Sequence, residues 1–116
     1  MSEESLTETL RRMLAFRHRG KASGIKAEFL AARLGITPRT LRRAVETLRG
    51  EGVPIGGRPA TGYFFAQTAE ERDDTCRFLY GRAMSSLKKV SRMKRIPLAK
   101  AGQELQEQIQ MDLEGQ

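Results

Sequence analysis

The sequence predicts a mainly α-helical fold with one small β-hairpin, and residues 27–66 carry the features that lead to this prediction. Apolar residues recur at helical spacing on both sides of Gly35. Thr37 and Pro38 then mark the start of a new helix, because threonine caps a helix N-terminus and proline suits the first helical position. Two short apolar runs surround a glycine- and proline-rich tip at residues 56–62, as in a β-hairpin.

Two helices are expected before Gly35. The first spans about residues 6–18 and opens with a capping box, in which Ser5 and Glu8 would each accept a hydrogen bond from an amide of the first turn. The second spans about residues 26–34 and ends at Gly35, because a left-handed residue without a Cβ is favoured there. The side chains expected to be buried in this second helix are Phe29, Leu30 and the stem of Arg33.

The third helix is expected at residues 38–50, and its apolar stripe indicates which face points outward. The inner stripe consists of Leu41, Ala44, Val45 and Leu48. At 100° per residue, a mostly basic set of side chains lies on the opposite face. That set consists of Arg39, Arg43 and Glu46, with Arg42 at the flank and with Thr37 and Thr40 at the N-terminal end of the helix.

The hairpin is expected to pair residues 52–55 with residues 63–66, and Ile25 is expected to form a short edge strand. A long helix then spans residues 69–95, beginning with a second capping box of Thr68 and Glu71. Pro97 ends it, and a last amphipathic helix follows.

The apolar residues of the long helix step by four, three, four and three positions. They are Cys76, Tyr80, Ala83, Leu87 and Val90. This spacing predicts a seam through which two copies pair as a homodimer over residues 69–95, with Cys76 buried. The alternative is that the helix folds back over the small core of its own chain.

The chain of 116 residues has a net charge of +7, and that charge is unevenly distributed. Residues 1–66 contain 12 Lys/Arg and 6 Asp/Glu, and residues 67–96 contain 8 and 4. Residues 97–116 contain 1 Lys/Arg and 4 Asp/Glu, so the tail is acidic. A basic field raises the local concentration of a polyanion, which favours a nucleic-acid partner for residues 1–96.

The composition argues against several other classes of protein. No apolar run approaches the roughly 18–20 residues that span a bilayer, and the acidic, polar N-terminus is not a secretory signal. One cysteine and one histidine provide neither a disulfide nor a zinc site, and we expect no metal and no cofactor. The run GGRPATG lacks the order of a phosphate-binding loop, and no catalytic set of side chains emerges. We expect a cytoplasmic protein that is not an enzyme and has no membrane or small-molecule partner.

A family resemblance covers about residues 6–66. The residues that carry it are Leu30, Ala31, Leu34, Gly35, Ile36, Leu41 and Val45, followed by Gly52-Val53-Pro54-Ile55 and Gly62-Tyr63-Phe64. In this order they resemble the winged helix-turn-helix domains of the biotin operon repressor and the DeoR-like transcriptional regulators. The resemblance implies a winged helix-turn-helix domain at residues 1–66, followed by a helical extension for dimerisation at residues 67–116. The ligase activity of the biotin repressor is not implied, because residues 67–116 have no counterpart of its catalytic domain.

The resemblance also implies double-stranded DNA as the partner, with the third helix in the major groove and the wing at residues 56–62 on the adjacent groove or backbone. Arg39 and Arg43 are candidates for bidentate pairing with guanine, and Glu46 is a candidate for accepting from a cytosine amino group. The remaining candidates contact phosphates or an adjacent groove: Thr37, Thr40, Arg42, Arg58, Lys26 and Lys21. His18, beside Arg17 and Arg19, is expected to be solvated or to face a phosphate.

These observations predict a sequence-specific double-stranded DNA-binding protein, in particular a small bacterial or phage transcriptional regulator. A DNA replication, recombination or packaging protein with the same fold stays open as an alternative. A winged domain that docks onto another protein is the alternative from a different class. The exposed arginines favour DNA over that alternative, since a protein-docking helix usually presents apolar or aromatic anchors.

Overall fold

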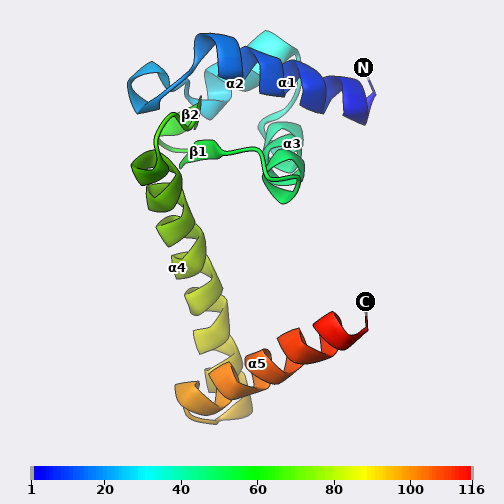
Figure 1. Ribbon diagram of the computed structural model, residues 1–116, viewed down its shortest axis with the longest axis vertical. Helices are drawn as coiled ribbons and strands as arrows, with labels where there is room; N and C mark the ends of the chain where they lie inside the picture. Colours follow the sequence, from blue (N-terminus) through cyan, green and yellow to red (C-terminus); the bar gives the residue numbers. More distant parts are fainter. Residues whose placement is uncertain (1, 116) are drawn as a thin grey trace. The chain divides into compact units, whose positions relative to one another are not determined.

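The computed structural model describes residues 2–115 and confirms the mainly α-helical fold with one two-stranded sheet (Figure 1). The helices are α1 (Glu3–Arg17), the short 3-10 helix η1 (Lys21–Ser23), α2 (Ala27–Leu34), α3 (Pro38–Gly50), α4 (Ala69–Lys94) and α5 (Leu98–Glu114). The strands are β1 (Ile55–Arg58) and β2 (Gly62–Phe65). The chain divides into two compact units, Met1–Cys76 and Arg77–Gln116, and the boundary lies within α4.

The core of the first unit is formed by α1, α2, α3 and the hairpin. Its innermost side chains include Leu10, Leu14, Leu30, Leu41 and Tyr63, all of them at most 2% exposed. The predicted inner stripe of α3 is confirmed, because all four of its apolar residues are buried. Leu41, Val45 and Leu48 each contribute roughly 1.5–3 kcal/mol on burial, so the inner face of α3 is strongly determined.

The turn between α2 and α3 has the expected construction. Gly35 adopts the left-handed conformation, with φ 67° and ψ 33°, and the Ile36 amide donates to the Ala31 carbonyl at 3.0 Å. Thr37 caps α3, because its hydroxyl oxygen accepts from the Thr40 amide at 3.1 Å. Pro38 follows as the first helical residue. Local chemistry thus fixes both ends of the turn.

The hairpin is shorter and begins later than the sequence suggested. Gly52 and Val53 close the end of α3, since their amides donate to carbonyls of α3, and pairing with β2 starts at Ile55, opposite Phe65. Gly57 lies inside β1 with φ 95°, and a Cβ at this position would collide with the Gly62 carbonyl. The predicted tip at residues 56–62 therefore reduces to a loop at residues 59–61.

Ile25 pairs with Tyr63 at the edge of this small sheet. The Ile25 amide donates to the Tyr63 carbonyl at 2.9 Å, and the Tyr63 amide donates back at 2.8 Å. The pairing is an isolated bridge rather than a full strand. It holds the segment before α2 against the wing.

The two predicted capping boxes differ from the observed caps. Helix α1 begins at Glu3, and Ser2 caps it by accepting from the Ser5 amide at 3.1 Å. The prediction of a Ser5–Glu8 box is wrong, because the helix starts three residues earlier and Glu8 pairs with Arg11 and Arg12 instead.

At the start of α4, Thr68 accepts from the Glu71 amide at 3.1 Å, as a capping box requires. The Glu71 carboxylate, however, accepts from the Lys21 and Gln67 amides, each at 2.8 Å. These backbone hydrogen bonds hold the pKa of Glu71 below its ordinary value, and the hydrogen bond from the Lys21 amide has the largest effect. Glu71 therefore fastens the loop around η1 to the first turn of α4.

Two predictions of burial are wrong. Phe29 is 58% exposed, because the short α2 buries the face that carries Leu30 and Ala31. Arg33 as a whole is exposed, and burial of its stem stays a prediction. Cys76 is also exposed. Thr75 takes the inward position one residue earlier, where its hydroxyl accepts from the Gly57 amide at 3.0 Å. In both helices a shift of one residue rotates a side chain by 100° away from the core.

The second unit consists of the later part of α4 and of α5. Helix α4 ends at Lys94, one residue before the predicted end, and Arg95 follows in the left-handed region with φ 56°. Pro97 precedes α5, whose Ala101 is buried. No helix within residues 2–115 is both long enough and apolar enough to cross a membrane.

Candidate nucleic-acid interface

The outward face of α3 is the candidate interface, and the folding of α3 explains why these side chains face outward. With its apolar stripe buried against α1 and α2, the helix leaves Arg39, Arg42, Arg43 and Glu46 exposed. The sequence-predicted set on this helix therefore lies on one surface. Its three arginines give that surface a positive charge.

The three outward arginines of α3 differ in their partners from Arg11, Arg12 and Arg72. Arg11 and Arg12 form ion pairs with Glu8, and Arg72 pairs with Asp73. Within residues 2–115, the side chains of Arg39, Arg42 and Arg43 have no hydrogen bond or ion pair. Their fifteen guanidinium N–H donors, five per arginine, are therefore available to an external acceptor.

At the N-terminal end of α3, the two predicted threonines are bonded to each other. The Thr37 hydroxyl accepts the Thr40 amide and donates to the Thr40 hydroxyl at 3.0 Å. Thr37 is thereby committed to the cap. Thr40 is half-buried and lines a cavity of about 260 Å³ together with Arg43 and the first residues of α1.

The start of α2, the start of α3 and the tip of the wing meet at a second cavity, of about 420 Å³. It is lined by Lys26, Glu28, Pro38 and the wing-tip residues Pro59 and Ala60. The structure thus brings the predicted Lys26 beside both the wing and the end of α3 that precedes Arg39. A polyanion lying along α3 would meet Lys26 and the wing tip on the same side.

Arg58 lies elsewhere. It is exposed, and it lines a cavity of about 310 Å³ with Lys21 and Asp74 rather than with residues of α3. The predicted phosphate candidates Arg58 and Lys21 are therefore neighbours, on the side of the wing that faces the start of α4. The acidic Asp74 beside them reduces the positive charge there.

Arg49 holds the wing in place, a structural role that the sequence did not reveal. Its Nε donates to the Ile55 carbonyl at 2.9 Å and its second guanidinium nitrogen donates to the Gly57 carbonyl at 3.0 Å. The guanidinium also lies over the face of the Tyr63 ring, 5.9 Å from the ring centre. Arg49 thus fixes the wing to the end of α3. No local pattern signals this role, because the acceptors belong to a different element.

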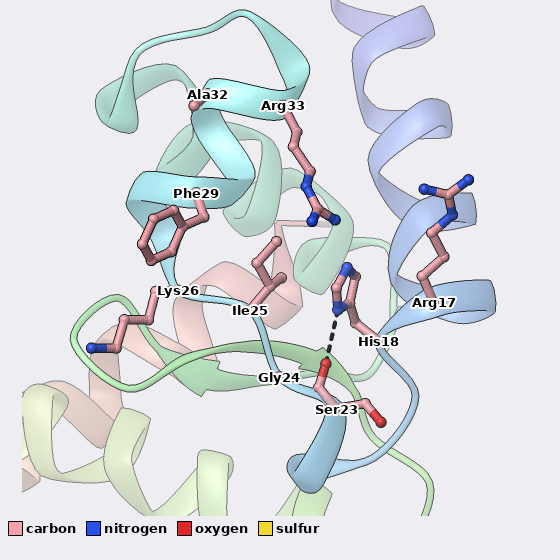
Figure 2. A pocket seen from close by; sticks show the side chains of 9 residues that line it. All are labelled: Arg17, His18, Ser23, Gly24, Ile25, Lys26, Phe29, Ala32 and Arg33. Carbon is pink, nitrogen blue, oxygen red and sulfur yellow. Dashed lines mark hydrogen bonds between the residues drawn. The ribbon is translucent and has the colours of Figure 1, made fainter.

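Another pocket, with a volume of about 800 Å³, lies between the end of α1 and α2 (Figure 2). Figure 2 shows Arg33 extending toward the His18 ring, whereas the Arg17 side chain points away from that ring. Lys26 and Phe29 complete the lining from the start of α2. His18 is half-buried and lines this pocket, so its side chain is only partly solvated, and a phosphate-facing role stays a prediction. Its Nδ1 donates to the Ser23 carbonyl at 2.8 Å, while its Nε2 is buried without a partner. The three cations make this a second positive surface that begins at Lys26.

Metal chemistry has no visible site in the described part of the chain. Among residues 2–115, no three His, Cys, Asp or Glu side chains are grouped as a metal ion requires. The chemistry that the exposed side chains offer is hydrogen bonding and charge, which suits recognition of phosphates and base edges.

Comparison with known proteins supports this interpretation of the first unit. Residues 9–64 match the sequence model of a family described as an HTH (helix-turn-helix) domain. No curated protein and no solved structure matches the chain. The match runs from the middle of α1 into β2 and so includes all of α2, α3 and β1, which build the outward face of α3 and most of the wing. The helix-turn-helix match and the two-stranded sheet after α3 together support a winged helix-turn-helix over residues 9–64, and with it DNA as a partner of this segment.

Proposed function

We propose that the chain is a sequence-specific double-stranded DNA-binding protein that acts as a small transcriptional regulator. The observation that carries this proposal is the outward face of α3, where three exposed arginines have no partner among residues 2–115. In this proposal α3 enters the major groove, with its N-terminal end toward the bases.

Each part of the interface has a separate task in the proposal. Arg39 and Arg43, one turn apart, pair with guanine O6 and N7, and Glu46 follows one turn later to accept from a cytosine or to orient an arginine. Arg42 contacts phosphate and fixes the orientation of the helix. Lys26 and the wing tip contact the neighbouring backbone or groove, since they lie at one cavity with the start of α3.

The positive pocket beside Lys26 extends this surface. Arg17 and Arg33 line it with His18, and a phosphate there would offer an acceptor to both guanidinium groups. We assign these residues to backbone contact, which positions the protein without reading sequence. Arg58 and Lys21 form a separate, weaker backbone site, because Asp74 lies beside them.

A protein-docking role for α3 is less well supported. The large hydrophobic side chains that are exposed within residues 2–115 do not include any residue of α3. A docking helix would be expected to present such anchors. The alternative of a replication, recombination or packaging protein uses the same DNA-facing surface, and the sequence of the preferred site together with its genomic position separates it from a regulator.

The test is selection of preferred sites from random duplex DNA, followed by affinity measurements at two salt concentrations. Arg39→Ala and Arg43→Ala are each expected to weaken binding to the selected site by about 10- to 100-fold and to relax the base preference at one position. Arg12→Ala is the charge-matched control, because Arg12 is exposed but paired with Glu8 on α1. It is expected to change the affinity less than about threefold. Absence of binding at low salt, or equal effects of all three substitutions, would contradict the proposal.

A further inference from the structure

The second unit leaves most of its apolar surface uncovered. Of the twelve large hydrophobic side chains that are exposed among residues 2–115, ten lie between Leu79 and Leu113. On α4, two of them, Leu79 and Val90, share one helical stripe with Ala83 and the half-buried Leu87, and we call these four residues the α4 stripe. On α5 the stripe consists of Leu98, Ala101, Leu105, Ile109 and Leu113. Both recur at helical spacing.

Only the first two turns of α5 are held against α4. Ala101 is 1% exposed, Leu87 lies close to Gly102, and Lys94 Nζ donates to Glu104 Oε2 at 2.7 Å. Beyond Glu104, the hydrogen bonds that α5 side chains form stay within α5, from Gln108 to Asp112 and from Gln110 to Glu114. Ile109 and Leu113 remain 44% and 59% exposed there.

The two helices carry opposite charges, and most of these charges lack a partner within the unit. Residues 77–94 contain six Lys/Arg and no Asp/Glu, whereas α5 contains four Asp/Glu and one lysine. Lys94 and Glu104 form an ion pair between the two helices. Other charged side chains of the unit have no ion pair among residues 2–115: Arg82, Lys88, Lys89 and Arg92 on α4, and Glu107, Asp112 and Glu114 on α5. An occupant of the exposed stripes must therefore bring acidic groups to α4 and basic groups to α5.

A second copy of the chain meets both requirements at once. We propose that two copies pair through their second units, with α5 of each copy lying on the α4 stripe of the other and closing a four-helix bundle. In a two-fold arrangement the same contact occurs twice, so both apolar stripes are covered by one interface. The acidic flank of α5 then faces the basic flank of the partner's α4.

This arrangement differs from the self-pairing of the long helix that the seam alone suggested. Pairing α4 with α4 would place six positive charges on each side of the contact, with no acidic residue of α4 after Asp74 to offset them. Like charges at neighbouring positions are destabilising. It would also leave Ile109 and Leu113 of α5 uncovered. The arrangement proposed above, with α5 of each copy on the α4 stripe of the other, is called the crossed arrangement. It avoids both the like-charge repulsion and the uncovered apolar residues of α5.

The test measures the mass of the full chain in solution without DNA, by sedimentation equilibrium. Twice the 13.0 kDa chain mass is expected. Leu105→Glu with Ile109→Glu is expected to give the monomer, whereas the control Gln106→Glu with Gln110→Glu adds the same charge off the stripe and should retain the dimer. Circular dichroism of each variant checks that the helices persist.

Charge reversal tests the crossed arrangement itself. Arg82→Glu with Lys89→Glu on α4, and Glu107→Lys with Asp112→Lys on α5, are each expected to weaken the dimer about tenfold or more. The variant that combines all four substitutions restores opposite charges across the contact and should return to within about threefold of the wild type. If α4 paired with α4, the α4 reversal would relieve like-charge repulsion, so the dimer would be tightened or left unchanged, and either result would overturn the crossed arrangement. A monomeric wild-type chain would overturn the dimer.

The consequence for DNA rests on the function proposed above. A two-fold dimer presents two α3 helices, so the selected site should contain two inverted half-sites. Because the mass is measured without DNA, a monomeric result leaves recognition by α3 intact. Conversely, a dimer whose Arg39 and Arg43 variants bind as tightly as the wild type would contradict the proposed function alone.

Discussion

Arg43 and Arg49 lie on the same helix, yet only Arg49 is held by the rest of the domain. The Arg43 side chain extends from the exposed face of α3, while Arg49 donates to two carbonyls of β1 and lies over Tyr63. A charged donor that satisfies two carbonyls contributes more than an exposed arginine, because its removal leaves both acceptors without a protein partner. Removing the Arg49 side chain should therefore lower the stability of the domain more than removing that of Arg43.

Replacing Arg49 with alanine is expected to lower the free energy of unfolding by about 2 kcal/mol, through loss of the hydrogen bonds to Ile55 and Gly57. Arg43→Ala is the matched variant and should change it by less than about 0.5 kcal/mol. Urea denaturation followed by circular dichroism measures both values. Equal stability of the two variants would show that Arg49 does not fasten the wing.

The outward-facing arginines of α3 could be predicted from the sequence because helical periodicity depends only on local spacing. The apolar stripe of α3 placed Arg39, Arg42 and Arg43 outward, and the structure has them there. Phe29 and Cys76 were misplaced because each lies one residue away from the buried face of its helix, where periodicity discriminates poorly. The role of Arg49 depends on the carbonyls of β1, which no spacing within α3 can reveal.

At the scale of elements, the wing depends on a glycine inside a strand. Gly57 combines φ 95° with a close approach to the Gly62 carbonyl, and its amide donates to Thr75 of α4. A side chain at this position is disfavoured both by the backbone conformation and by lack of space. The sequence suggested a loose glycine-rich tip, whereas the structure uses Gly56 and Gly57 for pairing.

The same substitution at two glycines is expected to have opposite effects. Gly57→Ala should destabilise the first unit by more than about 1 kcal/mol, because alanine is incompatible with the native conformation. Gly81→Ala should stabilise α4 by up to about 1 kcal/mol, since Gly81 lies in an exposed helix interior with nothing within 4 Å of an added Cβ. Thermal unfolding of both variants provides the comparison. A neutral Gly57→Ala would mean that the wing adjusts freely.

The helix boundaries were easier to predict than the strand boundaries. Helix α3 occupies the predicted residues, because Thr37, Pro38 and the final glycine act within one turn of the helix end. The start of β1 moved from Gly52 to Ile55, because strand pairing is decided by β2 and by hydrogen bonds that close the end of α3. Non-local pairing of this kind leaves no fixed spacing in the sequence.

At the scale of the whole molecule, the division at Cys76 separates two kinds of surface. The first unit has a well-buried core and exposes arginines, whereas the second unit buries little beyond Ala101 and exposes apolar stripes. The hydrogen bonds that tie the start of α4 to the wing and to η1, from Gly57 to Thr75 and from Lys21 to Glu71, lie entirely within the first unit. These two hydrogen bonds therefore do not involve residues 77–116.

A fragment of residues 1–76 is accordingly expected to fold cooperatively and to remain monomeric. It should still bind one half of the selected site through α3, but about a hundredfold more weakly than the full chain, because the linkage between two DNA-binding domains is lost. Proton–nitrogen correlation spectra report the fold, and anisotropy measurements on half-site and full-site duplexes report the binding. The full chain should prefer the full site strongly, while the fragment should bind half-site and full-site duplexes with similar intrinsic affinity. An unfolded fragment would show that the second unit supports the first, and an undiminished affinity would show that residues 77–116 contribute nothing to DNA binding.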